Sequence, residues 1–303
     1  MEKIYKFILI LSVAFIFVAC GKKGDPLPPI SKKPLYVNSL KLRQQGNSIV
    51  VSWNYIPRYD DNRPLKEFFF KIYLNEEIVS PKIYSKGDLY WFSFKIPNLK
   101  KEYCFNMYVV SKGQESDSSP IECIIPSEDY PDKPKILDIE LKEEGLLIKW
   151  NGEGDFINIY RSNDELIPPV PLKRIKNLYS YLDRDLVFNK KYCYYITTEN
   201  KEVESEKSNT VCKDFIDIFP PNPPSDFKLL KKNNDYYLIW KESPSKDVIG
   251  YMIYKNGKPL FNIPIKTYFF IDRSYKKGDR YFIVAIDRAG NKSEKVYLEK
   301  VIE

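Results

Sequence analysis

Histidine is absent from the 303 residues, and its absence narrows the chemistry open to the chain. Without imidazole there is no Ser-His-Asp or Cys-His catalysis and no metal site with histidine ligands. Long runs with apolar residues at i, i+3 and i+4 are also lacking, which disfavours helices. A large excess of one charge is also lacking, because 48 Lys+Arg and 41 Asp+Glu give a net charge of only +7. This mild excess predicts no nucleic-acid partner.

The N-terminus carries a short apolar run between two lysines and a cysteine. Lys3 and Lys6 precede residues 7–19, which are 13 residues without a charge, and Cys20 follows. At the helical rise per residue this run covers about 20 Å, less than the ~30 Å core of a bilayer. The segment therefore predicts an export signal and not a transmembrane helix.

The run Phe17-Val18-Ala19-Cys20 resembles the lipobox of bacterial lipoproteins, with Phe17 in place of the usual Leu. The resemblance implies cleavage before Cys20 and acylation of that cysteine, for example with palmitate. A signal peptide (1–19) and a lipid-anchored, Pro-rich linker (20–36) would result, in the outer membrane of a bacterial cell envelope and facing the periplasm. An ordinary signal peptide with an incidental cysteine is the alternative.

Three units of equal length follow the linker. Tyr103, Tyr192 and Tyr281 are 89 residues apart, and each opens a run typical of a β-strand. An earlier run in each unit alternates apolar and polar residues, which predicts strands with one buried face. These earlier runs end at Trp53, Trp150 and Trp240. In the third unit Asn256-Gly257 predicts a tight hairpin turn.

A unit of this length with a Pro-rich start, an early Trp and a late Leu-x₅-Tyr pattern resembles a fibronectin type III domain. Leu186 and Tyr192 match the late pattern, whereas Leu99 lies only four residues before Tyr103. The resemblance predicts an all-β fold of three tandem immunoglobulin-like β-sandwiches, which also follows from several short alternating strands. The expected domains are 37–127, 132–216 and 222–303.

The repeated aromatic residues are expected to be structural. The three tryptophans would fill the space between two sheets, and each of the three tyrosines would place its hydroxyl on a backbone group. Aromatic cages for a ligand are the alternative.

The remaining four cysteines form two pairs, each separated by 19 residues, in the first two repeats. An exported protein meets an oxidising compartment. The matching positions predict two disulfides, Cys104–Cys123 and Cys193–Cys212. The third repeat has Phe282 and Val301 at the places given by the same spacing. A Cys₄ zinc site would need closely spaced pairs that converge, and is not expected.

Carboxylates and surplus aromatics are the remaining candidates for function. Asp60-Asp61 and Asp183/Asp185 are expected in solvated turns rather than as catalytic acids, although a weak calcium site near Asp60–Asn62 is conceivable. Tyr84, Tyr90 and Trp91 are surplus aromatics in the first repeat, and one ring each of Tyr194/Tyr195 and Tyr236/Tyr237 is expected to face solvent.

The sequence thus predicts a non-catalytic, lipid-anchored envelope protein without a cofactor or metal. Its tandem domains would act as a binding or spacer module, most simply for another protein. The alternatives are a module that binds carbohydrate or peptidoglycan and, with less support, a cryptic hydrolase.

Overall fold

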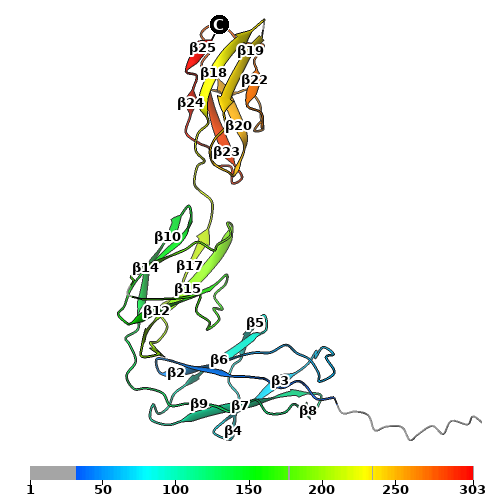
Figure 1. Cartoon of the computed structure of the whole chain (residues 1–303), viewed down its shortest axis with the longest axis vertical. Helices are drawn as coiled ribbons and strands as arrows, with labels where there is room; N and C mark the ends of the chain where they lie inside the picture. The colour runs from blue at the N-terminus through cyan, green and yellow to red at the C-terminus, as the bar shows by residue number, and fades with distance from the viewer. Residues whose placement is uncertain (1–31, 177, 234, 303) are drawn as a thin grey trace, which may run out of the picture. The chain divides into compact units, whose positions relative to one another are not determined.

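The computed structural model describes residues 32–302 apart from 177 and 234, and in this part of the chain every regular element is a β-strand (Figure 1). No helix among these residues is long and apolar enough to cross a membrane. The predicted signal peptide (1–19), Cys20 and most of the predicted linker (20–36) lie outside the described residues. The chain forms two compact units, Met1–Glu128 and Asp129–Glu303.

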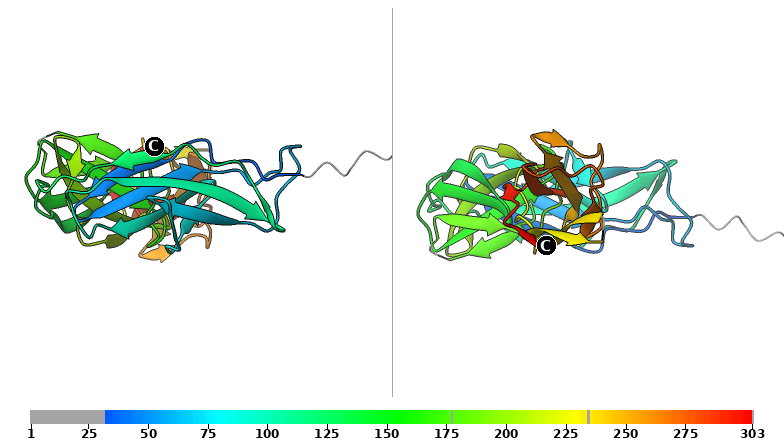
Figure 2. Two further views of the ribbon diagram at one scale, coloured as in Figure 1. Left: turned by 90° about the horizontal axis from the view of Figure 1, so that it is seen from below. Right: turned by 90° about the horizontal axis from the view of Figure 1, so that it is seen from above.

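The first unit contains the first repeat as two sheets, drawn in blue to green in Figures 1 and 2. One sheet has the order β1-β2-β6-β5, with β1 (Lys41–Gln45), β2 (Ser48–Asn54), β6 (Leu89–Lys95) and β5 (Tyr84–Lys86). The other has the order β4-β3-β7-β8, with β9 also paired to β7. Its strands are β4 (Glu77–Val79), β3 (Phe69–Leu74), β7 (Tyr103–Ser111), β8 (Gln114–Glu115) and β9 (Glu122–Ile124).

The second repeat, in the second unit, has the same two-sheet plan. Three strands form one sheet in the order β10-β11-β14, namely β10 (Lys135–Lys142), β11 (Gly145–Asn151) and β14 (Ser180–Asp183). The other sheet is built around β12 and β15. It contains β13 (Lys173–Ile175), β12 (Phe156–Ser162), β15 (Lys190–Asn200), β16 (Val203–Glu204) and β17 (Val211–Phe215).

The third repeat, also in the second unit, consists of two four-stranded sheets. The first has the order β22-β19-β18-β25, with β22 (Phe269–Ile271), β19 (Asp235–Lys241), β18 (Ser225–Lys232) and β25 (Lys300–Ile302). The second has the order β21-β20-β23-β24, with β21 (Lys258–Pro259), β20 (Val248–Lys255), β23 (Tyr281–Asp287) and β24 (Val296–Tyr297). The predicted Asn256-Gly257 turn is confirmed, since both residues have positive φ between β20 and β21.

Each repeat has its own apolar core, and the predicted tryptophans lie in these cores. Trp53, Trp150 and Trp240 are at most 5% exposed, and the alternating residues of the same strands point inward with them. Their indole N–H groups are buried without a hydrogen-bond partner among the described residues. The three rings therefore stabilise the sandwiches by burying area, which supports the structural interpretation over aromatic cages.

Two of the three predicted tyrosine hydroxyls bind backbone groups. The Tyr103 hydroxyl donates to the carbonyl of Asn98 (2.8 Å) and accepts from its N–H (3.1 Å). The Tyr192 hydroxyl accepts from the N–H of Val187 (2.9 Å). For Tyr281 the expectation is wrong, because its hydroxyl donates to a buried carboxylate, that of Asp272, at 2.5 Å.

Both predicted disulfides are present. Cys104 of β7 lies opposite Cys123 of β9, and Cys193 of β15 lies opposite Cys212 of β17. A zinc site on these cysteines is therefore excluded while the disulfides are intact, because the metal needs thiolate ligands.

In the third repeat the partner of Phe282 is Tyr297 and not Val301. The connection between β23 and β24 is shorter, so the strands meet 15 residues apart where the disulfides span 19. The backbone of Val301 instead pairs with Leu229 in the other sheet. The 89-residue spacing therefore locates β23, but it misses the register of this strand by two residues, since Arg280 binds the turn residue Asn256 as Cys104 binds Asn75.

The second repeat buries a carboxylate together with a cation and a tyrosine. Asp183 is 1% exposed and accepts hydrogen bonds from Nη1 of Arg161 (2.8 and 2.9 Å) and from the Tyr194 hydroxyl (2.8 Å). Arg161 and Tyr194 face each other across β12 and β15. The expectation that Asp183 lies in a solvated turn is wrong, because its side chain is enclosed by these two partners.

The third repeat has the same set of groups, with Lys255 in place of arginine. Lys255 Nζ lies 2.9 Å from Asp272, and Lys255 faces Tyr281 across β20 and β23. Burial opposes ionisation of Asp272, but hydrogen bonds from Ser274, Tyr281 and Lys255 outweigh it and lower the pKa of Asp272 to about 2. Burial and the Asp272 carboxylate together raise the pKa of Tyr281, which keeps its hydroxyl protonated.

The first repeat fills the same place with apolar side chains. Leu74 and Phe105 face each other across β3 and β7, and the rings of Phe94 and Phe105 lie 5.9 Å apart. These three residues occupy the strand positions of the cation, the tyrosine and the carboxylate of the second repeat. A buried ion pair can be replaced by apolar groups as a complete set, but removal of one partner leaves a buried charge.

We predict that Arg161→Leu alone destabilises the second repeat by about 3–5 kcal/mol, since it strands the buried Asp183 carboxylate. The triple variant Arg161→Leu, Asp183→Phe, Tyr194→Phe should recover more than half of that loss. Hydrogen exchange of β12, β14 and β15 in the full chain under denaturant measures the stability loss of the single variant and its recovery in the triple variant. Arg184→Leu, which removes an exposed arginine near Glu144, is the matched control and should change stability by less than about 1 kcal/mol. A triple variant no more stable than the single one would contradict the prediction.

We also predict acid sensitivity of the third repeat. Asp272 has a lower pKa when folded (about 2) than when unfolded (about 3.9), so its stabilising effect is complete above about pH 5 and is lost as pH falls through about 2. Denaturant midpoints of β19 and β23, read by pulsed hydrogen exchange, should fall across this window. The Asp272→Asn variant should be less stable at neutral pH, and its denaturant midpoints should decrease less as the pH is lowered. An equally steep fall in the variant would assign the effect to other carboxylates.

Candidate functional site

Three aromatic rings lie side by side across the outer face of the third repeat's second sheet. Residues of β20 and β23 alternate, so that Ile253 and Ile283 point into the core and Tyr254 and Phe282 point away from it. The Tyr254 and Phe282 rings are stacked with centroids 4.5 Å apart, and the Tyr297 ring follows at 5.8 Å from Phe282. We call Tyr254, Phe282 and Tyr297 the aromatic ladder.

The ladder is accessible at Tyr297 and flanked by cations. Tyr297 is 62% exposed, whereas Tyr254 and Phe282 are half-buried. Lys295 Nζ lies 4.9 Å from the centre of the Phe282 ring, and Lys292 Nζ lies 3.3 Å from the Tyr254 hydroxyl. The Phe282 ring is therefore stacked on Tyr254 of the neighbouring strand β20, and it also contacts Tyr297 of β24 and Lys295, which directly precedes β24.

A groove adjoins the ladder where β20 turns into β21 and β23 begins. Its volume is about 610 Å³, and it is lined by Asn256, Gly257, Asp279, Arg280, Tyr281, Phe282, Tyr297 and Leu298. Apolar side chains of the ladder thus form one wall of a concave site that has polar groups at its rim. This combination is typical of a pocket for an anchoring side chain.

The second repeat covers the corresponding surface. Tyr160 and Tyr195 are stacked at 4.3 Å, but they are 0% and 3% exposed. They form a small buried cluster with Ile167, from the segment after β12, and with the Cys193–Cys212 disulfide. In the first repeat Tyr73 and Tyr108 lie 5.7 Å apart and are half-buried. A directly opposed aromatic pair is thus shared by the second and third repeats, whereas Tyr73 lies opposite Asn106 and contacts Tyr108 diagonally. The exposed extension to Tyr297 belongs to the third repeat.

The aromatics singled out from the sequence have different places. Both Tyr194 and Tyr195 are buried, so the expectation that one faces solvent is wrong. Trp91 is also buried, with Tyr84 stacked on it at 6.1 Å. Tyr236 and Tyr237 are half-buried. Strand alternation alone misses these outcomes because covering segments decide exposure.

The ladder itself was missed by the sequence reasoning, although a signal existed. The hairpin turn after Tyr254 and the tyrosine that opens β23 place Tyr254 next to Phe282. Arg280 has the place of Cys104, because its N–H binds Oδ1 of Asn256 as the N–H of Cys104 binds Oδ1 of Asn75. Phe282 lies two residues further along the strand and therefore on the same outward face. The partner strand could not be found in this way because the connection is shorter.

Carboxylates come together at one place outside the ladder. Oxygens of Asp217, Asp247 and Asp287 lie within 4.8 Å of one another, and Asn291 donates to both oxygens of the buried Asp287. Near the calcium site considered from the sequence, Asp61 instead pairs with Lys32 (2.7 Å) and Arg63 (2.8 Å), which compete with a cation.

Comparisons with known proteins add little to this description. No protein-family model matches the chain. No curated protein matches it either. Among solved structures, the crystal structure of the chicken CNTN1 FN1-FN3 domains is similar at 15% identity, covering 88% of this chain and 98% of that one, with a TM-score of 0.25.

Proposed function

We propose that the chain is a non-catalytic, lipid-anchored protein of the bacterial cell envelope that binds another protein through its third repeat. The lipobox-like run ending at Cys20 supports the anchor, and the following Pro-rich linker supports an extended tether. The first two repeats then act as spacers, and the aromatic ladder with its groove is the binding surface.

The exposed aromatic ladder is the observation that carries this proposal. Aromatic side chains that border a pocket are the usual anchors of protein interfaces, because a large apolar area becomes buried at small cost in side-chain entropy. Sugar rings, by contrast, stack on free aromatic faces, and the Phe282 faces already contact Tyr254, Tyr297 and Lys295. This geometry favours a protein over the carbohydrate alternative.

A catalytic role receives no support from the buried carboxylates. Asp183 is bound by Arg161 and Tyr194, and Asp272 by Lys255 and Tyr281. An acid for glycoside hydrolysis needs a free proton and access to the substrate. Both carboxylates instead stabilise their sandwiches, so we assign no reaction to them.

Site-specific photocrosslinking in cells tests the binding surface. A photoreactive phenylalanine analogue at Tyr297 should give a discrete crosslinked protein, because this residue borders the groove. The same analogue at Tyr179 is the matched control, since that tyrosine is 64% exposed in the second repeat but lies away from the ladder. Tyr297→Ala should abolish capture by an analogue placed at Lys295. Equal crosslinks from Tyr179 and Tyr297, or retention on purified peptidoglycan that Tyr297→Ala removes, would contradict a protein-specific site.

Metabolic labelling with an alkynyl palmitate analogue tests the anchor. The wild-type chain should incorporate the label and sediment with membranes, because several acyl chains at about 0.8 kcal/mol per buried CH₂ bind stably. Cys20→Ser should lose the label completely. Cys104→Ser, which breaks a disulfide but leaves Cys20, is the control and should keep it. A labelled Cys20→Ser variant would refute acylation at this residue.

A further inference from the structure

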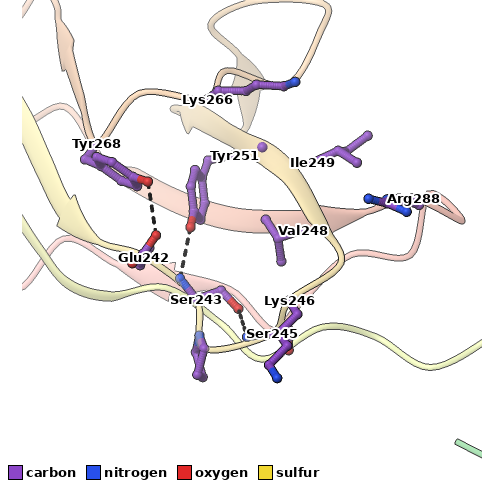
Figure 3. Close-up of a pocket in the computed structure, with 12 residues that line it drawn as sticks. Glu242, Ser243, Ser245, Lys246, Val248, Ile249, Tyr251, Lys266, Tyr268 and Arg288 are labelled. Atoms are coloured by element: carbon purple, nitrogen blue, oxygen red, sulfur yellow. Dashed lines mark hydrogen bonds between the residues drawn. The ribbon is translucent and has the colours of Figure 1, made fainter.

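The third repeat has a second cavity at the opposite ends of β20 and β23 from the ladder. It has a volume of about 690 Å³ and lies over the segment that leads from β19 into β20, with Lys266, Tyr268 and Arg288 completing its wall (Figure 3). Its remaining lining residues are Glu242, Ser243, Pro244, Ser245, Lys246, Val248, Ile249, Gly250 and Tyr251.

Hydrogen bonds hold the floor of this cavity in place. The Tyr251 hydroxyl accepts the N–H of Ser243 at 2.9 Å, and Ser243 Oγ accepts the N–H of Ser245 at 3.1 Å (Figure 3). Ser243 Oγ also donates to the carbonyl of Asn222 at 2.6 Å. Burial raises the pKa of Tyr251, so its phenol stays protonated and can donate a hydrogen bond. The site is therefore preorganised and does not need to fold around a ligand.

The rim of the cavity is cationic. Lys246 and Lys266 lie at opposite ends in Figure 3 and Arg288 lies at one side, and all three are exposed. None of them forms an ion pair with any residue that the structure describes. Glu242 is the acidic lining residue, and its carboxylate accepts a hydrogen bond from Tyr268 at 3.0 Å. Among the lining residues three cations and one anion leave an excess of two positive charges. The carboxylates of Asp217, Asp247 and Asp287 gather next to this lining, since Asp247 follows Lys246 and Asp287 precedes Arg288.

Apolar surface lies beside these charges. Ile249 is 38% exposed and Tyr268 is 53% exposed. Because the cations stand apart around an open cavity, a single carboxylate cannot reach all three. A chain that carries several carboxylates together with apolar atoms matches both the charge and the extent of the site.

We propose that this cavity is a second binding site, which takes an acidic peptide segment through its side-chain carboxylates. Arg288 binds one carboxylate with its planar guanidinium, and Lys246 and Lys266 bind others along the segment. The site uses different residues and a different ligand chemistry from the ladder, so it stands whether or not the ladder binds a protein.

Fluorescence polarisation of the full chain with a labelled octaglutamate peptide tests the site. Saturable binding that weakens as salt increases is expected, because exposed charges are screened. The double variant Lys266→Gln, Arg288→Gln should reduce affinity about tenfold. Lys276→Gln, Lys277→Gln is the matched control, since it removes the same charge from exposed residues of the same repeat. This control should stay within about twofold of the wild type. Glu242→Gln keeps a hydrogen-bond acceptor for Tyr268, removes the acidic lining charge and should strengthen binding.

Several results would overturn the proposal. One is equal loss of affinity in the two double variants, which would show attraction to net charge alone. Another is binding of free glutamate as tight as that of the peptide, which would assign the cavity to a small acid. A third is tighter binding of inorganic polyphosphate, lost in the Lys266→Gln, Arg288→Gln variant, which would assign it to phosphate. No binding of the peptide at low salt would also exclude it.

Discussion

Burial of one face of every strand is the constraint on which the rest of the structure depends. A two-sheet sandwich gains stability mainly from the apolar layer between its sheets, so inward positions are restricted to residues that fill this layer. Trp53, Trp150 and Trp240 show how strictly inward positions must fill this layer, since each ring is buried although its N–H group has no hydrogen-bond partner among the described residues. The outward positions of the same strands are under no such restriction.

The buried cation, carboxylate and tyrosine show a second way in which one position can be filled. The first repeat uses Leu74, Phe94 and Phe105, whereas the other two use charged and hydroxyl groups. In each complete set every buried polar or charged group has a partner, whereas a mixture of the two sets leaves a buried charge unpaired. The charged set also fixes geometry, because a carboxylate with three donors permits fewer arrangements than apolar contact does. Divergence between repeats therefore had to change several strands together.

The fold could be predicted because its strands and repeats are periodic in the sequence. Alternation around the tryptophans and the spacing of the tyrosines were sufficient for the all-β sandwiches and for both disulfides, because these features depend on short-range register. Burial of Asp183 could not be predicted, since it depends on Arg161, which lies 22 residues away on the opposite sheet. The site was less predictable still. Exposure of Tyr195 and Tyr297 differs because a covering segment with Ile167 is present in one repeat, and spacing carries no information about such segments.

The sheet that carries the ladder is held together without a covalent link. In the first two repeats a disulfide joins the last two paired strands, whereas in the third repeat Phe282 of β23 lies opposite Tyr297 of β24. A disulfide across a loop of this length contributes roughly 3 kcal/mol, and an aromatic contact contributes about 0.5–1.5 kcal/mol beyond its buried area. The pairing of β24 with β23 is therefore weaker, and β24 is only two residues long. The place of the cysteine is taken by Arg280, whose N–H binds Asn256 as the N–H of Cys104 binds Asn75. The ladder is thus an extension of the aromatic pair that the second repeat also has, and it does not replace the disulfide.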